Sequence, residues 1–322
     1  MSPQRRALIP RLHPTLPPYC DLPMSVSDAA FAASGLPADR LEQLLEVART
    51  AALAGAQPLK ELFGSLERVR EKGGSGNLVT EADLAAEAAV LAVLAEATPS
   101  FGVLAEESGR REGEGPLEWC VDPLDGTTNY AHGFPIFCTS VGLLHHGRPL
   151  LGALVVPLLD QLFFAAPGLG AWCNDRRLRV TPCARLSDAL LATGFAYDRA
   201  SRRDNNYAEF ACFTHRSHGV RRAGAAAVDL AFVAAGAVDG YWERGLSPWD
   251  LAAGVVLVEQ AGGVVSGYRG EALDLTSGRV LACAPGLQAP MIEALAACQP
   301  LPGGLYGAPE LDGESCAGSP TP

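Results

Sequence analysis

At positions 119–130 an apolar, strand-like segment runs directly into acidic and hydroxyl residues, and no other feature constrains the chain as strongly. The segment reads Trp119-Cys120-Val121-Asp122-Pro123-Leu124-Asp125-Gly126-Thr127-Thr128-Asn129-Tyr130. Pro123 favours an extended conformation at Asp122, and Gly126 permits a tight turn. Two carboxylates three residues apart, with a backbone carbonyl between them, can therefore face one point, as a hard cation such as Mg²⁺ requires. An ordinary β-turn would use the same residue types.

Three further groups of acidic residues lie at the ends of predicted elements. Glu106-Glu107 follows an apolar strand, Asp250 opens an apolar helical run, and Thr80 with Asp83 matches a capping box. Each also has an ordinary explanation. The paired glutamates are typical of a solvated turn, Asp250 is favoured by the helix dipole, and Asp83 is a helix cap. Taken singly, none of them indicates a metal site.

Hydrophobic periodicity predicts a mixed α/β chain in two halves, an α+β half at 25–184 and an α/β half at 185–298. Residues 1–24 are predicted to be a disordered arm or a mis-called start, and residues 299–322 a disordered tail. The first half is predicted to hold helices at 37–53, 59–69 and 80–97, strands at 101–104, 118–121, 139–144, 151–156 and 162–165, and a hairpin at 170–180. The second half is predicted to alternate strands at 190–194 and 240–243 with helices at 224–235 and 250–261.

Composition excludes several classes of function. The 322 residues carry a formal net charge of −11, which argues against a protein that binds the phosphate backbone of nucleic acid. No apolar run reaches the roughly 18–20 residues of a membrane span, so no membrane partner is expected. Nine cysteines without a CxxC pair favour reduced thiols and a cytoplasmic location.

The order of the acidic motifs resembles that of the inositol monophosphatase family, which are Mg²⁺-dependent, lithium-sensitive phosphomonoesterases. The resemblance covers about residues 40–298, and both segments that characterise the family, 119–132 and 249–263, are intact. The matching positions in chain order are Lys72, Asp83, Glu106-Glu107, Asp122 to Thr128, Gly224 to Ala226, Glu243 and Trp249-Asp250. The resemblance implies an αβαβα layered sandwich of the sugar-phosphatase type and a homodimer.

Carried over residue by residue, the resemblance implies a site for two to three Mg²⁺ ions. The implied ligands of a first ion are Glu106, Asp122 and the Leu124 carbonyl, those of a second are Asp122, Asp125 and Asp250, and those of a third, weaker site are Glu106 and Asp83. Two cations about 3.5–4 Å apart would neutralise a phosphate dianion and acidify a bound water. No Cys or Ser nucleophile is then needed.

The resemblance also implies which residues act and which bind substrate. The residues implied to be catalytic are Asp83, Glu106 and Thr127, with Asp83 and Thr127 orienting the attacking water. The residues implied to bind substrate are Gly126, Thr127, Gly224, Ala226, Glu243 and Asp250. Within this set, backbone N–H groups of Gly126 and Thr127 would hold the phosphate, and Gly224, Ala226 and Glu243 would contact the alcohol portion.

The expected partner is a small-molecule phosphate monoester, and the expected reaction is hydrolysis of inositol 1-phosphate by direct attack of metal-activated water. Histidinol phosphate and adenosine 3′,5′-bisphosphate are alternative substrates within the family. A noncatalytic scaffold or regulatory partner is the alternative from another class. Two positions depart from the common family pattern: Asn77 stands where Asp is usual, and Ala225 where Ser or Thr is frequent. The second departure bears on the choice of substrate.

Overall fold

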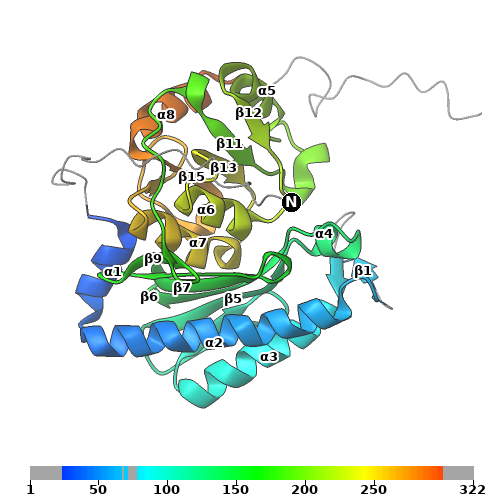
Figure 1. Ribbon diagram of the computed structural model, residues 1–322, viewed down its shortest axis with the longest axis vertical. Coiled ribbons are helices and arrows are strands. Elements are labelled where there is room, and N and C mark those ends of the chain that lie inside the picture. The colour runs from blue at the N-terminus through cyan, green and yellow to red at the C-terminus, as the bar shows by residue number, and fades with distance from the viewer. Residues whose placement is uncertain (1–23, 67–68, 72–77, 300–322) are drawn as a thin grey trace, which may run out of the picture.

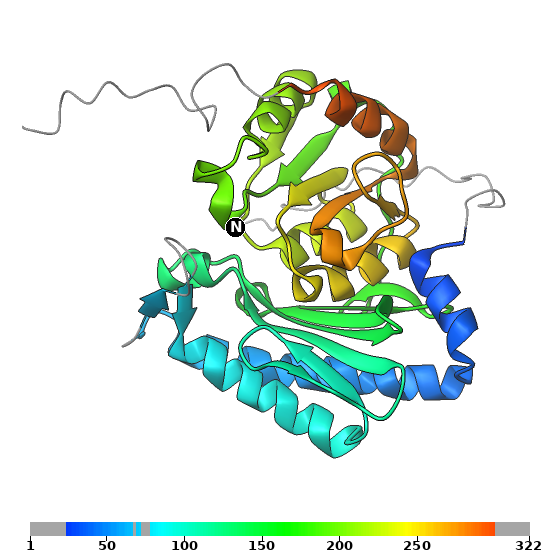
Figure 2. The same ribbon diagram turned by 180° about the vertical axis from the view of Figure 1, so that it is seen from behind.

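The computed structural model describes residues 24–66, 69–71 and 78–299 as five stacked layers (Figure 1). Lys72 and Asn77 lie outside the described residues, as do all but one residue of each terminal segment predicted at 1–24 and 299–322. Two helices cover the outer face of an eight-stranded sheet, two lie between the sheets, and two cover the far face of a five-stranded sheet, as Figure 2 shows from behind. The six helices are, in that order, α2 (Ala38–Leu62) and α3 (Glu81–Ala97), α6 (Ala226–Ala234) and α7 (Pro248–Gln260), and α5 (Tyr207–Arg216) and α8 (Gln288–Ala297). The predicted αβαβα layering is confirmed.

The larger sheet has the strand order β10-β9-β8-β7-β6-β5-β3-β4 and is antiparallel except for the parallel pair β3 and β5. Its strands are β3 (Gly102–Ala105), β4 (Gly109–Arg111), β5 (Leu117–Asp125), β6 (Cys138–His145), β7 (Arg148–Val156), β8 (Gln161–Ala166), β9 (Gly170–Cys173) and β10 (Arg176–Arg177). Because helices cover both faces, its central strands β6 and β7 are buried along almost their whole length, and β7 reads as a nearly continuous apolar run.

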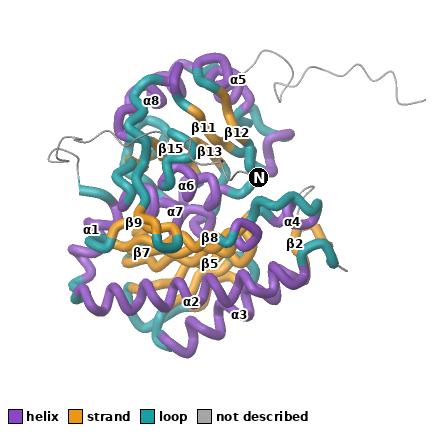
Figure 3. Tube along the Cα trace, viewed as in Figure 1, coloured by secondary structure: helices purple, strands orange, loops and turns teal. Residues whose placement is uncertain are grey.

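The smaller sheet lies above the larger one in the view of Figure 3, where strands are orange. It has the order β12-β11-β13-β15-β14, with β11 parallel to both of its neighbours. Its strands are β11 (Leu190–Thr193), β12 (Gly219–Arg221), β13 (Gly240–Arg244), β14 (Val264–Ser266) and β15 (Arg279–Cys283). The remaining elements are α1 (Val26–Ser34), α4 (Thr127–Ala131) and the hairpin of β1 (Val69–Glu71) with β2 (Leu78–Thr80). The boundary predicted near residue 185 falls between the two sheets and stays a prediction, because α6 and α7 also pack on the larger sheet.

The central helix α7 lies unusually close to the larger sheet, because glycines face it. A Cβ atom on Gly142 would lie 2.7 Å from the Ala252 side chain, and one on Gly152 would lie 2.4 Å from Ala253 Cα. Only small residues on both surfaces allow this approach. The close packing fixes the beginning of α7, which carries Asp250, beside the carboxyl end of β5.

The prediction of a separate helix at 59–69 is wrong. Residues 59–62 are helical but belong to α2, which continues through Pro58 to Leu62, whereas residues 63–66 are not helical and Val69 begins β1. A proline inside a helix removes one backbone hydrogen bond and so disfavours this continuation. Burial outweighs that loss, since Leu59 is fully buried and Gly55 approaches Val90 of α3. Ten of the helices and strands in the described part of the chain were not predicted: α1, α4, α5, α8, β1, β2, β4, β12, β14 and β15.

The composition led us to expect no membrane-spanning segment and reduced cysteine thiols. No helix among the described residues is long and apolar enough to cross a membrane. The seven cysteines in the described part of the chain are all free thiols.

Candidate metal centre

The segment from Asp122 to Asp125 belongs to β5 itself, not to a turn that follows a shorter strand. Asp122 aligns with Ser140 of β6, whereas Asp125 aligns with Cys138, so β5 holds one extra residue in this interval. Residues three apart on a regular strand point to opposite faces, and a bulge of one residue restores a common face. The bulge therefore lets both carboxylates point to the same side of the sheet.

Two helix beginnings meet these carboxylates. Asp125 accepts hydrogen bonds from the first backbone N–H groups of α6, at 3.2 Å from Ala226 and 2.7 Å from Ala227. Asp250, at the beginning of α7, accepts the Ser247 N–H at 2.7 Å. Carboxylate oxygens of Asp122, Asp125 and Asp250 all lie within 4.8 Å of one another. We call these three residues the carboxylate triad.

The triad concentrates negative charge without a basic partner. Burial raises the pKa of Asp122 and Asp250 well above the usual range, and the neighbouring carboxylates raise it further. Burial also raises the pKa of Asp125 to about 6, although the N–H groups of α6 oppose the shift. Among the described residues, no Lys, Arg or His side chain forms an ion pair with the triad. Clustered oxygen ligands that repel one another fit a hard divalent cation, which would supply the missing charge.

Glu106 joins the triad from the end of β3. Its carboxyl group is hydrogen-bonded to Asp122, and the residue is half-buried. The parallel pairing of β3 with β5 places Ala105 beside Val121, so the residues that follow lie side by side. The next backbone N–H, that of Glu107, donates to Glu87 of α3 at 2.9 Å. The adjacent glutamates are therefore part of an ordered turn beside the carboxylates.

Asp83 is both a helix cap and a neighbour of the site. Its Oδ2 accepts the Thr80 N–H at 2.8 Å as part of the predicted capping box, and it also accepts the Thr80 hydroxyl at 2.6 Å. Its Oδ1 accepts the Thr127 hydroxyl at 3.1 Å. The same hydroxyl lies 3.0 Å from the Leu124 carbonyl. The capping explanation and the site explanation for Asp83 are thus compatible, because they use different oxygens.

The turn at Gly126 begins α4 and requires glycine. Its φ of 94° is left-handed, and a Cβ atom there would lie 3.1 Å from the Ile136 carbonyl and 3.2 Å from the Ala225 methyl. Asn129 holds this turn against the second half of the chain by donating to the Ile136 and Ala223 carbonyls at 2.7 and 2.8 Å. Sequence analysis assigned Asn129 no role, although its place within the 119–130 motif was a signal.

Glu243 lies on β13 of the smaller sheet, near the carboxylate triad. It is buried on β13 and accepts the Tyr241 hydroxyl at 2.5 Å. Burial raises its pKa to about 7, against the opposing effects of the Tyr241 hydrogen bond and the Arg222 charge. The Asp125 charge also acts on it, so Glu243 lies near the triad without belonging to it. Gly224 precedes α6 with a φ of 85°.

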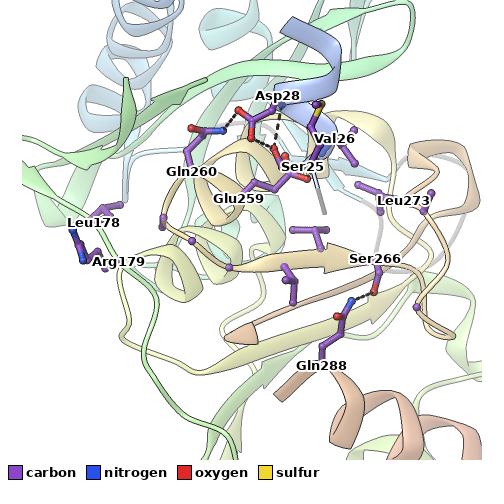
Figure 4. Close-up of a pocket in the computed structure, with 18 of the residues that line it drawn as sticks. Ser25, Val26, Asp28, Leu178, Arg179, Glu259, Gln260, Ser266, Leu273 and Gln288 are labelled. Atoms are coloured by element: carbon purple, nitrogen blue, oxygen red, sulfur yellow. Dashed lines mark hydrogen bonds between the residues drawn. The ribbon is translucent and has the colours of Figure 1, made fainter. Parts of the chain in front are cut away.

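A separate cavity of about 680 Å³ lies between α1, the end of α7 and β14 (Figure 4). Glu259 lines it and accepts the Val26 and Ser27 N–H groups of α1, both at 2.9 Å. None of the predicted site residues lines this cavity. The Glu259 carboxylate therefore caps α1. The candidate metal centre remains the carboxylate triad.

The family profile, the sequence relatives and the solved structures most similar to this chain include inositol monophosphatases in each case. The profile of the inositol monophosphatase family matches residues 40–300. An inositol-1-monophosphatase of Synechocystis is 48% identical over 80% of this chain and 90% of its own length. The Nus factor SuhB of Pseudomonas aeruginosa is 40% identical over 75% of this chain and 92% of its own. The solved inositol monophosphatase of Anabaena superposes with a TM-score of 0.75 and 46% identity, over 81% of this chain and 98% of that one.

Proposed function

Because the chain belongs to the inositol monophosphatase family and is a phosphatase, we propose that it hydrolyses inositol 1-phosphate to inositol and inorganic phosphate with Mg²⁺ as cofactor. One observation carries the proposal: the oxygens of three carboxylates lie within 4.8 Å of one another. A purely structural cluster of this kind would be destabilising, since burying like charges together is unfavourable.

The proposed ligands are those implied by the family resemblance. Asp122, Asp125 and Asp250 would hold the principal ions, joined by Glu106 and the Leu124 carbonyl, with Asp83 beside a third, weaker site. The hydrogen bond between Glu106 and Asp122 supports this grouping. When bound, divalent cations supply the positive charge that offsets a phosphate dianion and lower the pKa of a bound water. Mg²⁺ suits an all-oxygen donor set, and either two or three ions per site remain compatible with it.

The protein's own groups would position the reactants. The Thr127 hydroxyl is held by Asp83 and the Leu124 carbonyl, an arrangement that suits orienting a water molecule. The backbone N–H groups of Gly126 and Thr127 would bind phosphate oxygens. The Cys138 thiol contacts Asp125 at 3.9 Å, but burial raises its pKa well above the usual range, and a protonated thiol is a poor nucleophile. This supports direct attack by water over a covalent intermediate.

The alcohol portion of the substrate would lie toward Gly224, Ala226 and Glu243. A buried carboxylate can accept hydrogen bonds from a polyol, and a site built to bond hydroxyls discriminates against alcohols that lack them. The raised pKa of Glu243 also permits a neutral carboxylic acid that donates a hydrogen bond. The ionised and the neutral forms of Glu243 can both hydrogen-bond to hydroxyl groups, so both favour a polyhydroxylated leaving alcohol over one without further hydroxyls.

A panel of phosphate monoesters tests the proposal. With Mg²⁺ present, inositol 1-phosphate is expected to give a higher kcat/KM than histidinol phosphate or adenosine 3′,5′-bisphosphate. Inhibition by millimolar Li⁺ is expected from the family resemblance. A higher kcat/KM for either rival ester would move the assignment to that substrate, and no phosphate release from any ester would contradict the proposal.

The homodimer and the cytoplasmic location stay predictions. The family resemblance supports the dimer, which sedimentation equilibrium on the full chain would test. The free thiols of the described cysteines are compatible with a reducing compartment.

A further inference from the structure

Residues 195–206 link β11 to α5, and buried hydrogen bonds fix the end of this segment. Asn206 adopts a left-handed conformation with φ 69°. Its side-chain amide donates to the Thr193 hydroxyl at 2.8 Å and to the Gly194 carbonyl at 2.7 Å. Its side-chain oxygen accepts the Trp242 indole N–H at 2.7 Å. The segment therefore closes back on β11, which precedes it, and on the neighbouring strand β13.

Arg244, the last residue of β13, holds the middle of the same segment. Its guanidinium makes two parallel hydrogen bonds to Asp198, at 2.8 and 3.0 Å, and its Nε lies 3.3 Å from Asp204. The Arg244 side chain is only 7% exposed. Bidentate pairs of this kind fix geometry as well as charge, so Arg244 restricts where the segment can lie. We call Arg244 with Asp198 and Asp204 the arginine clamp.

Tyr197 lies next to the clamped Asp198 and begins the short helix η3 (Tyr197–Ala200). Its hydroxyl is hydrogen-bonded to Thr128 of α4. Thr128 directly follows Thr127, so this bond places the Tyr197 hydroxyl beside the turn that begins α4. Burial raises the pKa of the phenol, and the charges of Asp125, Glu106 and Asp250 raise it further. The residue as a whole is nevertheless 54% exposed. An aromatic ring thus stands beside the candidate centre with much of its surface open to solvent.

We propose that Tyr197 is a specificity-determining residue that contacts the alcohol portion of the substrate, and that Arg244 is the positioning residue that holds it there. The inference rests on the proposed function. A ring alcohol such as a cyclitol or a sugar has a C–H face that can pack on an aromatic side chain, whereas a short open-chain alcohol offers less surface. The predicted substrate class is therefore the phosphate monoester of a ring polyol.

The test compares two esters and one inhibitor. For Tyr197→Ala, KM for inositol 1-phosphate is expected to rise about tenfold, the size of effect typical of one lost apolar contact. The kcat for that ester, KM for glycerol 2-phosphate and the competitive Ki of inorganic phosphate are expected to stay within about twofold. Tyr197→Phe removes only the hydroxyl, so it separates the ring contact from the bond to Thr128.

Arg202 provides a matched control for Arg244. Both arginines pair with Asp198, but the Arg202 side chain is 64% exposed and the Arg244 side chain 7%. Arg244→Met is expected to raise KM for inositol 1-phosphate as Tyr197→Ala does, whereas Arg202→Met leaves it unchanged. The double variant Tyr197→Ala with Arg244→Met should match Tyr197→Ala alone, because the two residues act on one contact. Should Arg244→Met fail to fold, Asp198→Asn takes its place.

Two results would overturn the inference. The first is an unchanged KM for inositol 1-phosphate in Tyr197→Ala. The second is an equal rise in the Ki of inorganic phosphate, which would place Tyr197 at the phosphate instead of the alcohol. Failure of the proposed function would look different from either result, because the unsubstituted protein would then release phosphate from neither ester. In that case the inference about Tyr197 would fail as well.

Discussion

The Thr127 hydroxyl donates to Asp83 Oδ1 at 3.1 Å and thereby joins the turn after β5 to the beginning of α3. The two residues are 44 positions apart, and the second oxygen of the same carboxylate is occupied by Thr80. A single aspartate thus fixes a helix beginning and a hydroxyl beside the triad. Chemistry at this hydroxyl and stability of α3 are coupled through one side chain.

Thr127→Val tests the role of that hydroxyl. Valine keeps the shape but cannot hold a water, so kcat is expected to fall by about 100-fold or more. The free energy of unfolding should fall by only about 1 kcal/mol, the usual contribution of one hydrogen bond. Thr127→Ser, which keeps the hydroxyl, serves as the control and should retain most of the activity. Similar kcat values for the Val and Ser variants would refute the orienting role.

Substitution within the triad should separate activity from stability. Asp122→Asn and Asp250→Asn each remove one negative ligand, so kcat is expected to fall at least about 1,000-fold, or about 4 kcal/mol of transition-state stabilisation. The same changes relieve repulsion in the metal-free protein. Its Tm in EDTA should therefore rise, by about 2–4 °C for each kcal/mol of relief.

Calorimetry in EDTA together with phosphate release in Mg²⁺ would measure both effects. If Asp250 were only a helix-capping acid, Asp250→Asn would keep near-normal activity and lose stability. That outcome would remove Asp250 from the metal centre.

The raised carboxyl pKa values give the metal-free protein a defined pH dependence. The folded-state pKa of Asp125 is about 6, whereas an unfolded Asp titrates near 3.9. The native state therefore holds a proton that the unfolded chain has released. This contribution to stability is fully present below about pH 4 and is lost as the pH rises through about 6. The pKa values of Asp122 and Asp250 are raised in the same direction.

Paired Tm measurements in Mg²⁺ and in EDTA between pH 5 and pH 8 would test this expectation. The Mg²⁺-induced increase in Tm should grow with pH, because a cation binds the ionised carboxylates. Asp125→Asn removes one titrating group and should flatten the trend. A stabilisation by Mg²⁺ that falls with rising pH would argue against binding at the triad.

Glu243→Gln tests the polyol contact. Gln keeps a side-chain oxygen that can accept the Tyr241 hydroxyl, so the fold should be preserved. Losing a hydrogen bond to a charged group is expected to lower kcat/KM for inositol 1-phosphate about tenfold or more. Hydrolysis of p-nitrophenyl phosphate, which has no such hydroxyls, should change much less. Equal losses on both substrates would mean that Glu243 supports the metal site or the fold.

Much of the layered fold could be predicted from local patterns. The strands β7 and β8 contain the apolar runs predicted at 151–156 and 162–165, and α3 begins at a recognisable capping box. The extension of α2 through Pro58 could not be predicted, because it depends on how Leu59 and Gly55 pack against residues distant in sequence. The short strands β12, β14 and β15 likewise depend on pairing partners that no local pattern specifies.

The candidate metal centre, like the fold, could be predicted only in part from the sequence. Spacing alone suggested that Asp122 and Asp125 share a face, but the bulge that brings this about was not visible in the sequence. The capping and catalytic readings of Asp83 seemed to compete because the separate use of its two oxygens is a three-dimensional fact. Tyr197 and Arg244 were missed for a related reason. Their importance comes from the folding of residues 195–206 beside the triad, and neither lies in a motif.

The central claim is that the carboxylate triad binds the metal on which hydrolysis depends. The most direct measurement is phosphate release from inositol 1-phosphate by the full chain in Mg²⁺, after exhaustive chelation with EDTA, and after Mg²⁺ is restored. The account predicts activity in the first state, its loss in the second and its recovery in the third. Undiminished turnover after chelation would contradict it.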